Sequence, residues 1–190
     1  MMTRTLPVAV TVILISMWQL QADAAPEALI HEWLAEELTS GGKVVGCQII
    51  VDGMVSTSLY VSANVALLAE AAGRLGIYTR TMVKITSAEI DVERAIKTPI
   101  PLFGGWIRTS SGTTVGNLKT LPTGPHYLGI SPGADLFVKL LEGVLEQGVT
   151  VGFQQRVGGL DTTVAFPAPP ADVLVKLNSC LKSLEETVLR

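Results

Sequence analysis

Apolar residues recur at two spacings along this chain of 190 residues. A spacing of two is typical of a half-buried strand, and a spacing of three or four is typical of an amphipathic helix. The strand spacing is clearest where Val149, Val151 and Phe153 alternate with polar or small residues. The alternation resumes from Leu160 to Phe166 after the turn Gly158-Gly159, which predicts a hairpin.

Two more hairpins are predicted earlier in the chain. β-Branched residues fill Lys43 to Val51, and the turn dipeptide Asp52-Gly53 leads into Met54 to Val61 as the partner strand. Trp106 to Thr109 and Thr113 to Leu118 flank a Ser-Ser-Gly turn and form the other hairpin.

The segment from Ala88 to Lys97 has two possible structures. Its apolar residues alternate with Glu89, Asp91 and Glu93, which favours a strand with an acidic outer face. Thr86 and Glu89 form a capping box, which favours a helix instead. The period of two fits more positions, and we therefore expect a strand.

Helical spacing predicts four helices. Pro26 to Thr39 opens with a proline and stops at Gly41-Gly42. Asn64 to Leu75 is rich in alanine and leucine, with an asparagine as its N-cap. Ser131-Pro132 begins a third helix with an apolar stripe, and Ala171 to Leu189 is the closing helix.

The predicted elements indicate an α+β fold. Leu121 to Gly129 is rich in proline and glycine and is expected to be a loop. The remaining elements predict a mostly antiparallel curved sheet or sandwich, with N-terminal and C-terminal helices packed against it. Roughly 165 residues suit one domain with a hydrophobic core, so a single globular domain is expected over residues 26–190.

The first 25 residues have the pattern of a secretory signal peptide. Arg4 precedes an apolar run from Leu6 to Trp18, which is too short to span a bilayer comfortably. Ala22 and Ala24 fit the small-residue pattern that signal peptidase accepts. An uncleaved membrane anchor is the alternative. We predict a periplasmic or secreted protein with no stable membrane anchor after cleavage.

The chain has two cysteines, and an oxidising compartment favours a disulfide between them. Cys47 lies on the apolar face of a predicted strand, and Cys180 lies on the apolar stripe of the closing helix. Both thiols are therefore expected to point into the same core. The alternative is a pair of buried free thiols that pack as small hydrophobic groups.

From Ser131 onward the predicted order is helix, strand, tight turn, strand ending in phenylalanine, and a helix with one cysteine. This C-terminal part resembles small periplasmic proteins of the invasion-associated locus B type, which likewise end in a sheet strand followed by a cysteine-bearing helix. The resemblance implies an exported, β-rich protein with an accessory envelope role and no chemistry of its own. The residues that carry it are Phe137, Leu140, Gly148, Val151, Phe166, Leu174, Leu177 and Cys180.

Residues that could carry chemistry are sparse in this sequence. His31 and His126 have no cysteine or carboxylate cluster at ligand spacing around them, so no metal site is predicted. No G-x-S-x-G elbow occurs, so no serine nucleophile is predicted. No phosphate-binding glycine pattern occurs either, and no cofactor is expected. His126 lies in a predicted loop and is the candidate for a catalytic imidazole.

The charge distribution narrows the function classes further. The formal net charge is -3, and the strongly basic face of a nucleic-acid-binding protein is missing. Arg74, Arg80 and Lys84 form a small local excess of positive charge, which is interpreted as solvated surface. We therefore expect an exported, non-enzymatic envelope protein that binds a protein partner or stabilises an assembly. The alternatives are a small secreted hydrolase that uses His126, and binding of a small ligand or lipid in the sheet.

The signal peptide leads to the first prediction. The exported protein should begin at Ala25 or Pro26, because the small residues that signal peptidase requires precede these positions. N-terminal sequencing of the exported protein measures this directly. A protein that keeps Met1 and partitions with membranes would show that the segment is an anchor.

Overall fold

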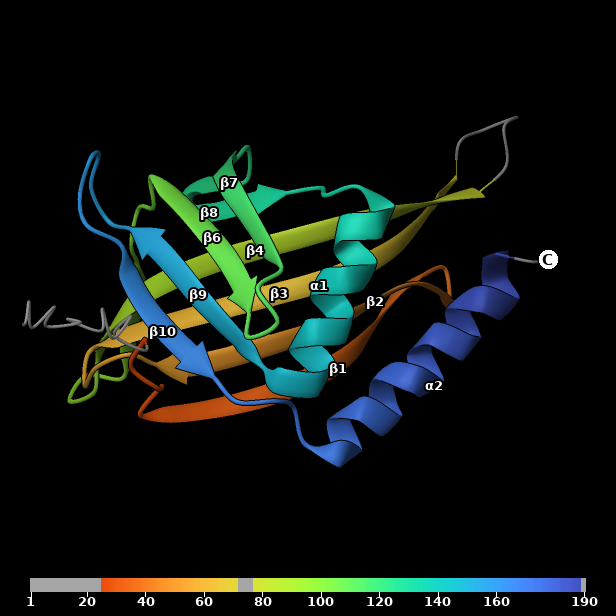
Figure 1. Ribbon diagram of the computed structural model, residues 1–190, viewed down its shortest axis with the longest axis horizontal. Helices are drawn as coiled ribbons and strands as arrows, with labels where there is room; N and C mark the ends of the chain where they lie inside the picture. The colour runs from red at the N-terminus through yellow and green to blue at the C-terminus, as the bar shows by residue number, and fades with distance from the viewer. Residues whose placement is uncertain (1–24, 72–76, 189–190) are drawn as a thin grey trace, which may run out of the picture.

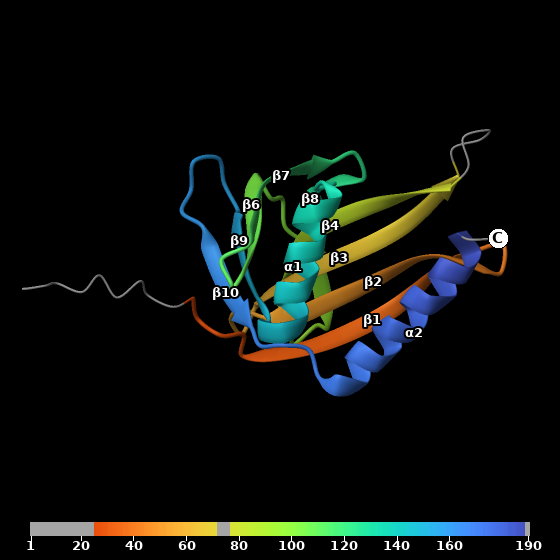
Figure 2. The same cartoon turned by 45° about the vertical axis from the view of Figure 1, so that its right-hand side comes forward.

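The computed structural model describes residues 25–71 and 77–188. Ten strands form one antiparallel sheet in the order β1-β2-β3-β4-β8-β7-β6-β9-β10, with β5 paired to β4. Figures 1 and 2 show both helices on the same side of the long strands. The elements are β1 (Ile30–Ser40), β2 (Lys43–Met54), β3 (Leu59–Ala71), β4 (Ile77–Asp91), β5 (Ile96–Pro99), β6 (Gly104–Thr109), β7 (Thr114–Leu121), β8 (Gly124–Ile130), α1 (Ala134–Gln147), β9 (Val149–Gln154), β10 (Thr162–Phe166) and α2 (Ala171–Val188).

The predicted α+β class is confirmed, but the N-terminal helix is wrong. Residues 26–39 contain most of β1, which pairs with β2 from Ile30↔Met54 to Ser40↔Lys43. Gly41 and Gly42 have φ of 57° and 76°, so they form a two-residue hairpin turn rather than a helix stop. Such turns need positive φ at both central residues, which glycine adopts without steric cost.

The second predicted helix, Asn64 to Leu75, is also wrong as far as the structure describes it. Residues up to Ala71 belong to β3, which lies between β2 and β4. Val61, Ala63 and Val65 are buried at alternate positions, as expected for one face of a strand. Pairing on both sides outweighs the helix propensity of alanine and leucine here. Residues 72–75 of the prediction lie outside the described residues, as do residues 1–24, which contain most of the predicted signal peptide.

Three smaller predictions also need correction. Strand β2 continues through Asp52 and Gly53 to Met54, so these two residues do not form the turn. The segment from Ala88 to Lys97 is extended only in part, because β4 ends at Asp91 and a turn precedes β5. Residues 121–129 are mostly strand β8, which pairs with β4 and β7 rather than forming a loop.

The hairpins β6–β7 and β9–β10 and both C-terminal helices are confirmed. Helix α1 begins at Ala134 rather than at Ser131, whose hydroxyl donates a hydrogen bond to the carbonyl of Thr81. Its C-terminal cap is Gly148, with φ of 81°. The buried stripe of α2 is the predicted one and consists of Val173, Leu177, Cys180 and Leu184.

A short N-terminal segment joins the two ends of the sheet. The backbone N–H of Ala28 donates to the carbonyl of Ala165 on β10, and the N–H of Ala165 donates to the carbonyl of Pro26. The next residue, Leu29, donates to Met54 on β2. The last strand is therefore covered at its edge by the residues that lead into the first strand, which protects it from edge-to-edge aggregation.

The inner face of the sheet holds the hydrophobic core. Helix α2 packs against β1 and β2, and α1 packs against β6 and β7. A disulfide between Cys47 of β2 and Cys180 of α2 fixes the closing helix to the sheet, with the two Cα atoms 5.8 Å apart. The largest fully buried side chains are Phe153, Ile49, Ile85, Leu102, Ile107, Leu128 and Leu140.

The disulfide should contribute strongly to stability. It closes a loop with a sequence separation of 133 residues. A double Cys47→Ser, Cys180→Ser variant should therefore lose about 4 to 5 kcal/mol of unfolding free energy, because its unfolded chain is less constrained. Urea denaturation of both proteins, with and without reductant, measures the difference.

Reductant should lower the stability of the wild-type protein toward that of the variant and leave the variant unchanged. Equal stability of the two proteins without reductant would contradict the proposed contribution of the cross-link. Alkylation of both cysteines in the folded, unreduced wild type would show that the bond does not form.

Candidate functional site

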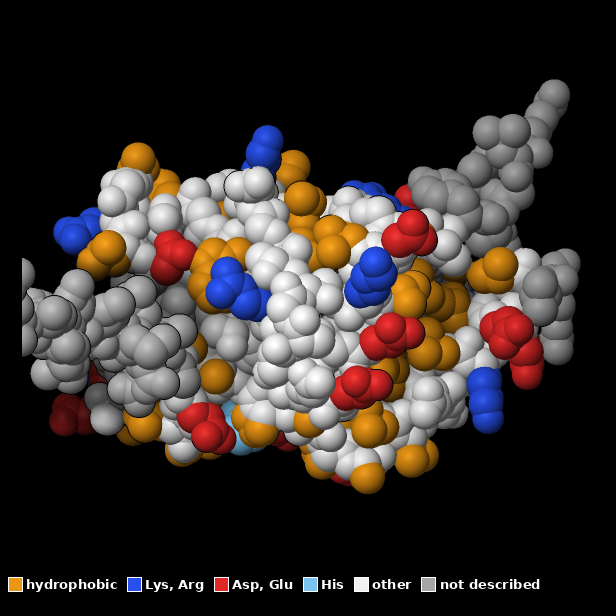
Figure 3. Space-filling model, in the orientation of Figure 1, with side chains coloured by type: hydrophobic (Ala, Val, Ile, Leu, Met, Phe, Trp, Pro, Cys, Tyr) orange, Lys and Arg blue, Asp and Glu red, His pale blue; other side chains and the backbone are white. Residues whose placement is uncertain are grey.

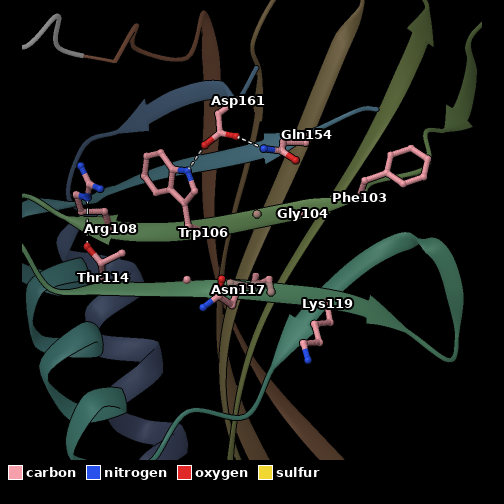
Figure 4. Close-up of a pocket in the computed structure, with 12 residues that line it drawn as sticks. Phe103, Gly104, Trp106, Arg108, Thr114, Asn117, Lys119, Gln154 and Asp161 are labelled. Carbon is pink, nitrogen blue, oxygen red and sulfur yellow. Dashed lines mark hydrogen bonds between the residues drawn. The ribbon is translucent and has the colours of Figure 1, made fainter. Parts of the chain in front are cut away.

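An open groove of about 530 Å³ lies on the outer face of β6, β7 and β9. Its volume is in the range of known small-ligand sites. Figure 4 shows side chains from neighbouring strands that project toward this space. The lining residues are Phe103, Gly104, Gly105, Trp106, Arg108, Thr114, Gly116, Asn117, Leu118, Lys119, Gln154 and Asp161.

A β-bulge in β7 shapes the floor of the groove. The register moves from Gly105↔Leu118 to Ile107↔Val115, so two residues of β7 lie opposite the single residue Trp106. Val115 and Leu118 are both buried although they are three positions apart. The extra residue, accommodated by the left-handed φ of 56° at Asn117, reverses the alternation between the two faces. Polar residues on both sides of the bulge therefore face the groove.

Trp106 is held in place by groups from β9 and from the loop that follows it. Its indole lies against Gly152, where an added Cβ would be 2.2 Å from ring atom Cε2. The indole Nε1–H donates a hydrogen bond to Asp161 Oδ2 at 2.5 Å, and the Gln154 amide donates to Asp161 Oδ1 at 2.9 Å. The Asp161 carboxylate thus joins two side chains of the groove wall (Figure 4).

Arg108 lies beside Trp106 on the same strand. Its Nε donates a hydrogen bond to Thr114 Oγ1 at 3.2 Å across the β6–β7 pair. Its Cζ lies 4.8 Å from the centroid of the Trp106 ring, which allows a cation–π interaction. Two contacts therefore orient a side chain that is exposed to solvent.

Large apolar side chains are exposed on the groove itself and on the β9–β10 loop, whose flanking residues Gln154 and Asp161 line the groove. Phe103 lines it and is 51% exposed, and Val157 and Leu160 of the β9–β10 loop are 82% and 92% exposed. Hydrophobic and basic side chains are visible on this loop at the upper left of Figure 3. Exposed apolar residues grouped at one place are typical of an interaction surface.

Sequence reasoning missed every residue of this groove as a functional candidate. Trp106 and Arg108 alternate with the buried Ile107 and Thr109, which is a signal that both point outward. The partners of Trp106 come from a loop more than fifty residues away, as the separation of 55 between Trp106 and Asp161 shows. A pattern of neighbouring residues in the sequence cannot reveal a contact between residues so far apart.

The candidate His126 lies elsewhere, on β8 rather than in a loop. Its ring centroid is 4.1 Å from that of Tyr127, and the Nζ of Lys84 lies 5.1 Å from the Tyr127 ring. Within the described residues, His126 makes no hydrogen bond to a serine or a carboxylate. The arrangement therefore lacks the nucleophile and orienting acid that a hydrolytic imidazole requires.

The sequence also drew attention to a group of basic residues and to a row of acidic residues on the predicted strand from Ala88 to Lys97. Arg80 forms an ion pair with Glu70 at 3.2 Å, and Asp91 accepts a hydrogen bond from the backbone N–H of Arg94. Glu93 lies in the turn after β4, so it does not continue the strand face of Glu89. Arg74 lies outside the described residues.

Tyr60 is a titratable group on β3 with an altered environment. Burial raises the pKa of its phenol, and the nearby Asp52 carboxylate raises the pKa further. The ring also lies 3.4 Å from the Nζ of Lys97. The phenol therefore stays protonated at neutral pH, where it can donate a hydrogen bond but cannot act as a base.

A smaller apolar crevice is relevant to the predicted alternative of lipid binding. It lies between α2 and the strands β3 and β4, with a volume of about 240 Å³. This is below the usual range for sites that enclose a drug-sized ligand. The groove on β6, β7 and β9 is larger and carries more polar groups, so we take it as the candidate site. The crevice is lined by Leu67, Thr79, Leu181, Leu184, Glu185 and Val188.

Comparison with known proteins does not assign this chain to a family. No family model matches it, and no match was found among curated proteins or solved structures. Among the residues that the structure describes, no three histidine, cysteine or acidic side chains are grouped to hold a metal ion. None of the described helices is both long enough and apolar enough to cross a membrane.

The packing of Trp106 on Gly152 leads to a prediction about the groove. A Gly152→Ala substitution should push the indole away from Asp161, because the new Cβ would overlap the ring. We expect a loss of about 1 to 3 kcal/mol in stability and a red-shifted Trp106 fluorescence. The fluorescence is measured in a protein that begins at Pro26 and carries Trp33→Phe, so that Trp106 is its one remaining tryptophan.

Gly116→Ala is the matched control, because an added Cβ there meets nothing within 4 Å although the residue lines the same groove. It should leave the fluorescence of Trp106 unchanged. Similar spectra for the two alanine variants would contradict the described position of the indole.

Proposed function

We propose that this chain is an exported, non-enzymatic protein of the bacterial envelope that binds a partner protein through the groove on β6, β7 and β9. The observation that carries the proposal is the combination of an oriented polar wall with exposed apolar residues beside it. Protein interfaces commonly combine aromatic and arginine side chains in this way.

The hydrogen bonds within the groove favour binding over catalysis. The Asp161 carboxylate accepts from Trp106 and Gln154, and Arg108 donates to Thr114. These side chains fix each other in position and leave the outer surface of the Trp106 and Arg108 pair available. Preorganised side chains lower the entropy cost of association, and this supports a recognition role.

The apolar rim supports a macromolecular partner. Val157 and Leu160 lie in a loop that extends beyond the strands it connects, as Figure 1 shows for the β9–β10 connection. Leaving such side chains in water is unfavourable, and covering them would contribute about 25 cal/mol per Å² of apolar surface. A flat protein surface could cover the rim and the groove together.

Two features of the chain support export. The N-terminal pattern of charge, apolar run and small residues is that of a signal peptide. The disulfide between Cys47 and Cys180 suits an oxidising compartment. The resemblance of the C-terminal part to envelope proteins of the invasion-associated locus B type also supports this location and an accessory role.

Site-specific cross-linking in the producing cells tests the proposal. A photoreactive amino acid at position 160 should form an adduct with one defined protein, because Leu160 is 92% exposed and directly precedes Asp161 of the groove wall. The same amino acid at position 175 is the control, since Val175 is 68% exposed on α2, away from the groove. Mass spectrometry identifies the adducts.

Equal adducts at positions 160 and 175, or none at position 160, would contradict the proposal. The hydrolase alternative is tested in the same cells by His126→Ala, which should leave the adduct and the phenotype of the protein unchanged. A hydrolytic activity that disappears with His126 at normal protein level would require a different function.

A further inference from the structure

The groove is positive although the chain as a whole is acidic. Its lining residues include two cations, Arg108 and Lys119, and one anion, Asp161. The formal net charge of the chain is -3. Each oxygen of the Asp161 carboxylate already accepts a hydrogen bond, one from Trp106 and one from Gln154. The groove therefore has the opposite sign to the protein that carries it.

Arg108 is oriented as a carboxylate receptor. Its Nε donates a hydrogen bond to Thr114, and its guanidinium group lies near the Trp106 ring. The two terminal nitrogens have no hydrogen-bond acceptor within the described part of the chain. A guanidinium held by its Nε side presents parallel N–H donors that match the two oxygens of a carboxylate.

Lys119 provides a second positive charge at the other end of the groove. Figure 4 shows Arg108 and Lys119 on opposite sides of Asn117. Thr114, the register partner of Arg108, precedes Lys119 by five positions on β7. At about 3.3 Å per residue, reduced by the bulge, the backbone positions of the two residues are roughly 15 Å apart, and both side chains project from the same face of the sheet. This distance is too long for a single carboxylate to contact both.

We propose that the groove binds an extended acidic segment of a partner polypeptide. This inference rests on the proposed function and adds the chemistry of the partner. Acidic residues four positions apart on an extended chain point to the same side and are roughly 13 Å apart. This spacing matches that of Arg108 and Lys119, because the flexible lysine side chain can cover the small difference. The exposed amide of Asn117, between them, can donate to and accept from the peptide backbone.

The apolar rim favours a polypeptide over an acidic polysaccharide. Phe103 and Leu160 offer exposed apolar surface beside the positive groove. Aliphatic side chains between or next to the acidic residues of a peptide could cover this surface. A sugar acid supplies carboxylates at a similar spacing but few aliphatic groups.

Fluorescence anisotropy with a synthetic peptide tests the inference. The probe is a short labelled peptide with two glutamates four positions apart, leucine beside them and no other charge. The mature, disulfide-bonded protein should bind it, and affinity should fall as ionic strength rises. An Arg108→Gln, Lys119→Gln variant should bind at least about tenfold more weakly, because two charged hydrogen-bonding contacts are lost.

The matched control is Lys139→Gln, Lys182→Gln, which removes the same charge from exposed helix positions outside the groove. It should bind like the wild type. The single variant Lys119→Gln, on an exposed side chain, keeps the test valid if the double groove variant is unstable. It should lose part of the affinity.

Three results would overturn the inference. The first is equal binding of a peptide with glutamine in place of glutamate, and the second is an equal loss of affinity in the groove and control variants. The third is tighter binding of an oligogalacturonate than of the peptide, which would make an acidic sugar the ligand. An adduct at position 160 together with failure of the peptide would keep the proposed partner binding and reject only the acidic chemistry.

Discussion

The fold depends on covering one face of a long curved sheet, and the Cys47–Cys180 disulfide is the constraint that secures this cover. Helix α2 contacts β1 and β2 through a narrow stripe of four buried residues, and Cys180 is one of them. A single helix with so narrow a stripe gains limited hydrophobic stabilisation. The covalent bond links the closing helix to the second strand, so the last part of the chain cannot leave the first without breaking it.

The inward packing of β6 and β9 explains why the groove can be built on the opposite face of these strands. Strands β6 and β9 carry Ile107, Val151 and Phe153 inward, and all three are fully buried. Their inward packing fixes the backbone from which Trp106 and Arg108 project outward. A rigid core on one face therefore provides a rigid backbone for the binding surface on the other, and the hydrogen bonds within the groove then orient its side chains.

Sequence patterns predicted the C-terminal half well, with the exception of β8, because most of its elements are locally determined. The β9–β10 hairpin has alternating residues around a glycine turn, and α2 has a regular apolar stripe. The predictions for the N-terminal half were wrong where one sequence pattern is compatible with two structures. Gly41-Gly42 can end a helix or form a hairpin turn, and only the pairing of β1 with β2 distinguishes them. The alanine-rich β3 is a strand because neighbours pair with both its edges.

The groove could not be predicted from the sequence because it depends on a change of register. A strict alternation along β7 would turn Lys119 to the same face as Val115, toward the core. The bulge at Gly116 and Asn117 inserts one residue and returns Lys119 to the outer face, which is occupied by Trp106 and Arg108. The bulge thereby brings the positive charges of Arg108 and Lys119 into one groove of an acidic chain. Since a chain with a net charge of -3 does not attract anions at long range, binding of an acidic partner in the groove depends on close contact. This favours a ligand with a defined spacing of charges over a nonspecific polyanion.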